Sequence, residues 1–281
     1  MRVEAKEEGF SFSEHDFERV RTLIYRQAGI SLNPGKQSMV YSRLARRLRH
    51  TGATDFRSYL DRLEAEPAGG GEWQEFVNAL TTNLTSFWRE SHHFPILAEH
   101  VASRARERPV ALWCCAASTG EEPYTMAITA MQACASRTPP VTILATDIDT
   151  AVLDKAQTGI YGEEAVARVA RGALKEHFLR GRGPNKGLVR MRPEVQALVR
   201  FRRLNLLDER WPIDTRFDAI FCRNVMIYFD KQTQYRVLHA LAARLAPDGL
   251  LFAGHSENFT QARDLFELQG RTVYRLAAGR R

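Results

Sequence analysis

The feature that most constrains the fold is a change of hydrophobic pattern near residue 110. Beyond it, short apolar runs occur at 110–117, 141–148, 200–206, 217–224 and 249–255. Helix-like stretches lie between several of these runs, at 121–136, 150–157 and 230–245. Strands that alternate with helices are typical of βαβ units. The pattern therefore predicts an α/β domain, with a parallel sheet covered by helices on both faces.

The first hundred residues show helical spacing instead. Ser13 is a good N-cap with Asp16 three residues on, and Gly29 can end that helix. Pro34 suits the first turn of a second helix, and two more apolar stripes follow at 56–63 and 73–80. We predict an N-terminal helical domain with its linker over 1–105, and the α/β domain over 106–281.

Segment 178–204 interrupts the strand–helix alternation. A turn at 182–187 separates stretches in which apolar and basic residues alternate with a period of two, up to 199–202. This period predicts a small antiparallel β subdomain inserted in the α/β domain. Near the end of the chain, two strand-like runs flank Gln269-Gly270 and predict a hairpin.

Positive charge is concentrated in two places. The net charge is +7, and segment 178–204 alone carries eight basic residues against one acid. On the second predicted helix, the basic side chains fall within about 100° of arc beside the apolar stripe. They are Lys36, Arg43, Arg46, Arg47 and His50. Two such patches favour an acidic partner, although a solvated face is the alternative.

Several classes of protein are disfavoured. The sequence has no apolar run of 18 residues, so we predict no membrane span. The N-terminus has no apolar signal region, so we expect a cytoplasmic protein. The four cysteines, Cys114, Cys115, Cys134 and Cys222, show no metal-binding spacing, so buried thiols are expected rather than zinc ligands or disulfides.

Small and acidic residues mark a candidate cofactor site. A turn of small residues follows the first predicted strand, and Gly120, Glu121 and Glu122 open the next helix. The turn is not a GxGxxG motif, and its glutamates would repel a pyrophosphate. Asp147, at the tip of the second strand, could accept hydrogen bonds from a ribose. Each feature could also be a simple helix start, but together they suggest S-adenosylmethionine, a nucleoside with a cation and no phosphate.

These residues resemble the chemoreceptor glutamate methyltransferases, the CheR family, over roughly residues 12 to 276. The matching stretches are 80–90 (LTTNLTSFWRE), 117–124 (ASTGEEPY), 147–149 (DID), 205–207 (NLL), 222–229 (CRNVMIYF) and 249–257 (GLLFAGHSE). Trp88 stands where the family pattern has phenylalanine.

The resemblance implies a helical N-terminal domain and a Rossmann-like methyltransferase domain. It implies methyl transfer to glutamate side chains on the cytoplasmic part of chemotaxis receptors, giving methyl esters and S-adenosylhomocysteine. Cofactor contacts carried over by motif are Asn83, Thr85, Arg89, Glu122, Asp147, Asn205, Leu206, Arg223 and Asn224. In some family members the inserted subdomain captures a C-terminal receptor peptide, and segment 178–204, with Arg190 and Arg192, is in the matching position.

The chemistry needs alignment more than acid–base groups. A glutamate with a pKa near 4.3 is already a carboxylate at neutral pH, and the sulfonium donor is already activated. No metal is needed. Arg89 and Tyr228 are our candidates for orienting the acceptor or donor, although Tyr228 could simply be a packed side chain. We expect His92 and His93 to lie on a helix surface.

Two other functions remain open. A nucleic-acid methyltransferase would also be basic, but the basic segment 178–204 contains only Phe178 and Phe201 as aromatic residues for stacking. A non-catalytic cofactor sensor would bind the same ligand without turnover.

Overall fold

The computed structural model describes residues 9–67 and 69–280. The chain forms two compact units that divide between Thr82 and Asn83. This boundary differs from the one expected after residue 105. Helix α5 (His93–Arg104) belongs to the second unit, because its Phe94, Leu97 and Val101 are buried in that unit's core.

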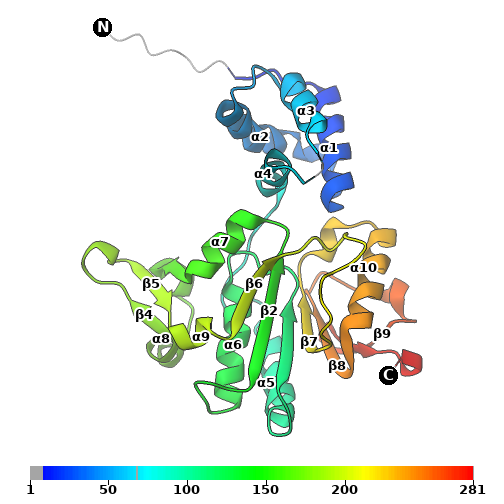
Figure 1. Cartoon of the computed structure of the whole chain (residues 1–281). Coiled ribbons are helices and arrows are strands. Elements are labelled where there is room, and N and C mark those ends of the chain that lie inside the picture. The colour runs from blue at the N-terminus through cyan, green and yellow to red at the C-terminus, as the bar shows by residue number, and fades with distance from the viewer. Residues whose placement is uncertain (1–8, 68, 281) are drawn as a thin grey trace. The chain divides into compact units, whose positions relative to one another are not determined.

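The first unit contains four α-helices, shown in blue and cyan in Figure 1: α1 (Glu14–Ala28), α2 (Gln37–Thr51), α3 (Phe56–Ala65) and α4 (Gly71–Leu80). The predicted capping box is confirmed, since the Ser13 hydroxyl and the Asp16 carboxylate each accept from the other's backbone N–H. Gly29 ends α1 with φ 68°. Pro34 begins a short 3₁₀ turn that leads into α2.

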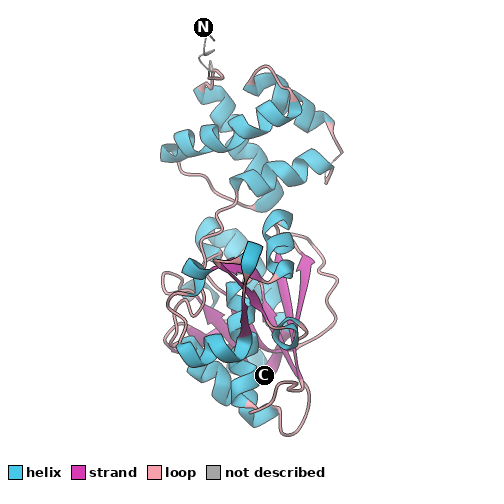
Figure 2. Cartoon of the chain, turned by 90° about the vertical axis from the view of Figure 1, so that its left-hand side faces the viewer, coloured by secondary structure: helices cyan, strands magenta, loops and turns pink. Residues whose placement is uncertain are grey.

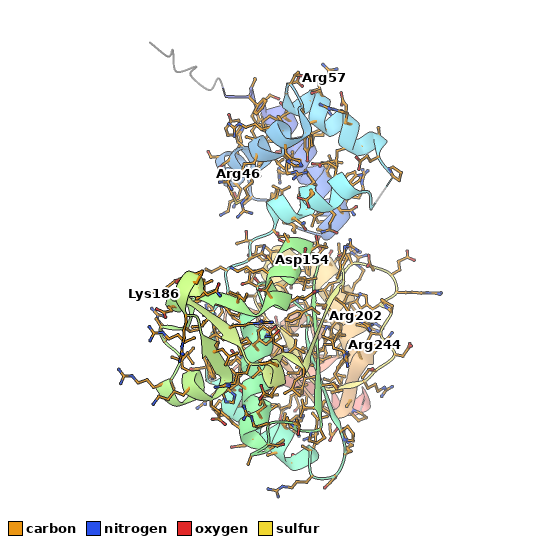
Figure 3. The ribbon with its side chains drawn as sticks, turned by 60° about the vertical axis from the view of Figure 1, so that its left-hand side comes forward. Arg46, Arg57, Asp154, Lys186, Arg202 and Arg244 are labelled. Carbon is orange, nitrogen blue, oxygen red and sulfur yellow. The ribbon has the colours of Figure 1, made fainter. Side chains whose placement is uncertain are left out.

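The basic residues of α2 do not form one free cationic face. Arg47 is paired with Glu72 at 2.6 Å and with Glu75 at 3.1 Å, both on α4. Arg43 donates to the backbone carbonyls at the end of α4, at 2.6 Å for Thr81. The expected cationic face is therefore smaller than the sequence indicated, because Arg43 and Arg47 tie α2 to α4. Arg46 is exposed on the surface of the unit (Figure 3).

The second unit is built on a seven-stranded sheet with the order β6-β2-β1-β7-β8-β10-β9. The strands are β6 (Val199–Arg203), β2 (Val141–Asp147), β1 (Val110–Cys114), β7 (Phe217–Cys222), β8 (Leu245–Ala253), β10 (Val273–Leu276) and β9 (Phe266–Gly270). The first five run parallel, while β10 pairs antiparallel with β8 and β9. The predicted α/β class and the C-terminal hairpin are confirmed.

Helices cover both faces of this sheet (Figure 2). Alternate residues of β1 point into two separate hydrophobic cores, one on each face of the sheet. Leu112 and Cys114 pack with α5 and α6 (Glu121–Ala133) on one face. Trp113 points to the other face, which α10 (Lys231–Arg244) covers. Helix α7 (Thr150–Thr158) follows β2 and contacts β2 and β6.

A separate three-stranded antiparallel sheet has the order β3-β5-β4. It contains β3 (Ile160–Gly162), β4 (Phe178–Arg180) and β5 (Leu188–Met191), with α8 (Arg171–His177) before β4 and α9 (Pro193–Gln196) after β5. The predicted small antiparallel sheet is thus confirmed, but its residues differ from the predicted range 178–204. Val199–Arg203 is the edge strand of the large sheet, and β3 was missed. A period of two indicates a half-buried strand without indicating its sheet.

Among the described residues, no helix is both long and apolar enough to cross a membrane. All four cysteines are unpaired, and Cys114, Cys115 and Cys222 are buried as expected, while Cys134 is half-buried.

Candidate active site

The predicted cofactor residues gather at the carboxyl edge of the parallel strands. Five loops leave this edge, after β1, β2, β6, β7 and β8. Backbone bonds tie the loops after β1 and β6 to the end of β2, from Ala117 N to Thr146 O at 2.9 Å and from Leu204 N to Asp147 O at 2.9 Å. The edge includes the point between β1 and β7 where the strand order reverses, and such points bind ligands in open α/β sheets.

Asp147 lies at the tip of β2 and is 8% exposed. One carboxylate oxygen accepts from Ser118 N at 2.8 Å, and the other accepts from Asp149 N at 3.0 Å. Burial raises the pKa of Asp147 to about 6, against the lowering effect of these backbone bonds. Asp147 is therefore a buried hydrogen-bond acceptor, and a ribose hydroxyl bound to it would be largely shielded from water.

Arg223, directly after β7, has a fully buried side chain between two acids. Its guanidinium lies 3.0 Å from Glu122 and 3.4 Å from Glu90, and it donates to the backbone carbonyl of Arg89 at 2.6 Å. Burial raises the pKa of Glu122, and the charge of Arg223 opposes that effect. When all three groups are ionised, the cluster has one net negative charge.

Glu90 was not predicted as a site residue, although it follows Arg89 in the matched stretch. Its carboxylate accepts from His255 at 3.0 Å and from the side-chain amide of Asn224 at 3.2 Å. Although burial alone would raise its pKa, these bonds and the charge of Arg223 lower the pKa of Glu90 to about 2. Glu90 therefore stays ionised and links the 83–90 segment to the loops after β7 and β8.

The acids that open α6 are less available than the sequence suggested. Glu121 accepts from the Thr119 hydroxyl at 2.6 Å, and Glu122 faces Arg223 and the Cys114 thiol. Negative charge at this edge thus comes from Glu90, Glu122 and Asp147, partly offset by Arg223, rather than from two free glutamates. This set of carboxylate acceptors fits a ribose hydroxyl pair and a positive group without phosphate.

The other predicted cofactor residues lie in the same loops. Asn83 donates to the Asp149 carboxylate at 2.7 Å, and its carbonyl accepts from the Ser118 hydroxyl. Arg89 is half-buried and donates to the carbonyl of Leu84 at 2.6 Å. The Asn205 side chain accepts from the backbone N–H of Leu207 at 3.0 Å. Thr85 is half-buried, and Leu206 is buried in the core on the α10 side.

Backbone strain is concentrated in these loops. Left-handed conformations occur at Trp88, Glu90, Ser118 and Asn224, with φ between 49° and 57°. None of the four is a glycine, and such residues persist only where surrounding contacts hold them, often at functional sites. Tyr228 ends a 3₁₀ turn of the loop after β7 and is half-buried against the core on the α10 side. Packing is thus part of its role.

Tyr161, on β3, is a residue that sequence reasoning missed. Its hydroxyl donates to the carbonyl of Thr119 at 2.8 Å. The next residue, Gly120, has φ 98°, and a Cβ there would lie 2.8 Å from the same hydroxyl. The ring of Tyr161 also packs edge-on against Phe87, as does Phe178 of β4. The small sheet therefore supports both the turn after β1 and the 83–90 segment.

One of the two histidines differs from expectation. His93 is fully buried, its Nε2–H donates to the carbonyl of Arg271 at 2.8 Å, and burial lowers its pKa to about 4, whereas His92 is partly exposed. The surface assignment is wrong for His93, because α5 turns this side chain onto the sheet. Glu90, His92 and His93 bring possible ligand atoms within 4.8 Å of one another. Glu90 already has three partners there, so we assign no metal.

Comparison with known proteins identifies the family. Residues 83–275 match the family model described as the CheR methyltransferase SAM-binding domain. Residues 15–81 match the model of the CheR all-alpha domain. The border between the two models coincides with the division between the two units.

Curated relatives agree over nearly the whole chain. A chemotaxis protein methyltransferase of Klebsiella aerogenes is 54% identical over 94% of this chain and 90% of its own length. The enzyme named chemotaxis protein methyltransferase 2 of Pseudomonas aeruginosa is 52% identical over 94% of both chains. That of Escherichia coli is 50% identical over 96% of this chain and 93% of its own. The chain therefore belongs to the CheR family and is a chemotaxis methyltransferase that uses S-adenosylmethionine.

Proposed function

We propose that this protein transfers the methyl group of S-adenosylmethionine to glutamate side chains on the cytoplasmic domain of chemoreceptors. The products are glutamate methyl esters and S-adenosylhomocysteine. The observation that carries the proposal is the meeting of Asp147, Glu90 and the Arg223–Asn224 pair at one sheet edge, in a chain of this family. We expect the reaction to take place in the cytoplasm.

The cofactor, when bound, supplies an activated methyl group on a positively charged sulfur. We assign its binding to Asn83, Thr85, Arg89, Glu122, Asp147, Asn205, Leu206, Arg223 and Asn224. Asp147 would accept from the ribose, and the acidic excess around Arg223 would favour the positive part of the molecule. Because the fixed partners of these groups hold them before binding, little ordering remains to be done.

The acceptor carboxylate needs orientation and no general base. We assign this role to Arg89 and Tyr228. One N–H group of Arg89 donates to Leu84, which restrains the guanidinium and leaves other donors for a carboxylate. A contact that is too strong would stabilise the ground-state anion, so a single oriented donor suits the reaction better than a full ion pair.

Receptor recognition is proposed for two surfaces. Lys36, directly before α2, and Arg46, on α2, are exposed and can steer an acidic receptor helix. Arg43 and Arg47 would act indirectly, by holding α2 in place. No role in nucleic-acid binding or membrane insertion is proposed.

The small sheet offers a surface for a receptor peptide. Ile160, Leu179 and Leu188 are 38 to 40% exposed, and the strand register places Ile160 and Leu179 on either side of Arg190. An extended peptide with an acidic end could pair with an edge strand and meet this apolar face and its arginine. Arg192 is half-buried and donates to the carbonyl of Lys175, so its contribution would be smaller.

The reaction is tested by incubating the protein with methyl-labelled S-adenosylmethionine and either receptor-containing membranes or nucleic acid. Base-labile label on the receptor is expected, because carboxyl esters hydrolyse in base. Label on nucleic acid would favour a nucleic-acid methyltransferase, and cofactor binding without label on either would favour a sensor.

The peptide surface is tested separately with Leu179→Asp, with Leu268→Asp as the control. Both leucines are exposed, but Leu268 lies on β9 of the large sheet. Only Leu179→Asp should weaken binding to receptors that carry a tail peptide. Equal binding by both variants would contradict the assignment.

A further inference from the structure

The buried carboxylate of Glu257 holds the loop that carries Arg223, Asn224 and Tyr228. Glu257 follows β8 and is 5% exposed. Its Oε1 accepts from Val225 N at 3.0 Å and Met226 N at 2.8 Å. Its Oε2 accepts from Asn224 N at 3.0 Å and Gly254 N at 2.6 Å. One side chain thus satisfies four backbone N–H groups from the loops after β7 and β8.

These bonds act where the backbone is strained. Asn224 has φ 57°, a conformation that costs free energy for a residue with a side chain. Three consecutive N–H groups, from Asn224 to Met226, turn toward one carboxylate, which is the geometry of an anion-binding nest. Without an acceptor these donors would be buried and unpaired, and another loop conformation would compete.

Gly254 shows how closely the two loops approach each other. A Cβ on Gly254 would clash with the side-chain amide of Asn224 and would lie 2.9 Å from both Asn224 N and Glu257 Oε2. The side-chain amide of Asn224 also donates to Glu90. The orientation of Asn224 is therefore determined by Glu257 through its backbone and by Glu90 through its side chain.

We propose that Glu257 is a positioning residue for methyl transfer. It sets the conformation of residues 223–228, and so presents Arg223 and Asn224 to the cofactor and Tyr228 to the acceptor. This inference rests on the proposed cofactor roles of Arg223 and Asn224. It assigns no contact between Glu257 and either substrate, because all four bonds of its carboxylate are made within the protein.

The test variant is Glu257→Gln in the full chain. The amide keeps the size of the side chain but replaces one acceptor oxygen with an NH₂ group, so two of the four donors lose their acceptor. Asp218→Asn is the matched control. Asp218 is also a buried carboxylate of this sheet, 3% exposed, and accepts from Ala111 N at 2.9 Å, but it lies near the opposite end of β7.

The dissociation constant of S-adenosylmethionine is measured by calorimetry, well below the unfolding midpoint of each variant. We expect Glu257→Gln to weaken binding by about tenfold or more, which a single lost interaction of ordinary strength would produce. We expect Asp218→Asn to bind within about twofold of wild type, although both variants lose stability. In methylation assays, only Glu257→Gln should combine a raised KM for the cofactor with a lowered kcat.

Gly254→Ala is a second variant, which crowds Asn224 and the Glu257 carboxylate but leaves that carboxylate chemically intact, and it should show the same loss of affinity. Wild-type affinity in both Glu257→Gln and Gly254→Ala would overturn the inference, as would an equal loss in Asp218→Asn. Asn224→Ala separates the two proposals. If it binds normally while Glu257→Gln does not, Glu257 acts through Arg223, and the cofactor role of Asn224 is refuted instead.

Discussion

The affinity for S-adenosylmethionine should fall as the pH is lowered through 6, because the role proposed for Asp147, accepting hydrogen bonds from the ribose, needs its ionised form. Burial raises the pKa of this carboxyl to about 6 in the protein without cofactor. Above that pH the carboxylate is present, and below it the added proton must be removed before the cofactor binds. The affinity for the cofactor is therefore expected to decrease in acid.

The size of the effect follows from this pKa. If only the ionised form binds, the apparent dissociation constant rises by about tenfold for each pH unit below 6. Between pH 7 and pH 5 the loss should be about tenfold. A carboxyl with an ordinary pKa near 4 would give almost no change in this range.

Calorimetric titration from pH 5 to 7 measures the effect, with circular dichroism to confirm that the protein stays folded. Asp147→Asn is the control, because an amide does not titrate. The variant should bind more weakly at pH 7 and should lack the tenfold change. Burial also raises the pKa of Glu122, so Glu122 could contribute to the pH dependence of binding. Only the part of that dependence that disappears in Asp147→Asn is therefore assigned to Asp147. A flat wild-type profile, or an unchanged profile in the variant, would refute the reasoning.

Three further outcomes are expected. Arg47→Ala should lower the free energy of unfolding by about 2–4 kcal/mol in urea titration, because it leaves Glu72 with the Tyr59 hydroxyl but without its counter-charge, whereas Arg46→Ala should change it by less than about 0.5 kcal/mol; equal effects would contradict the assignment. Gly120→Ala should cost about 1–3 kcal/mol and weaken cofactor binding, since its φ is 98° and its Cβ would meet Tyr161, and an unchanged melting temperature would count against this. Burial lowers the pKa of His100 to about 4, so the stability that its neutral form provides is present above pH 6.5 and is lost toward pH 4; His100→Gln should flatten the pH dependence of thermal unfolding by up to about 3 kcal/mol in that window.

Much of the architecture was predictable because it depends on local periodicity. Alternating short apolar runs and helical stretches predicted the α/β unit, and Ser13 and Gly29 marked the ends of α1. Motif positions after the strands predicted which loops would meet, since carboxyl ends of parallel strands share one edge. Asp147, at the tip of β2, lies at this shared edge as predicted from its position after the strand.

Only the tertiary structure determined which partners the charged and buried side chains have. From the sequence alone, Arg43 and Arg47 were expected on the basic face of the second helix. Nothing local indicated that α4 supplies their hydrogen-bond acceptors. In the same way, Val199–Arg203 has the pattern of any half-buried strand, and only its pairing with β2 assigns its sheet.

The active-site edge shows the same division. The sequence determined that Arg223, Glu122 and Glu257 follow or precede particular strands, but it did not determine that Arg223 lies between acids or that Glu257 binds four N–H groups. The physical reason is the range of the interactions. Helix caps and strand periods are set by neighbours along the chain, whereas a buried charge is compatible with folding only after distant segments have brought its counter-charge or its hydrogen-bond donors to it.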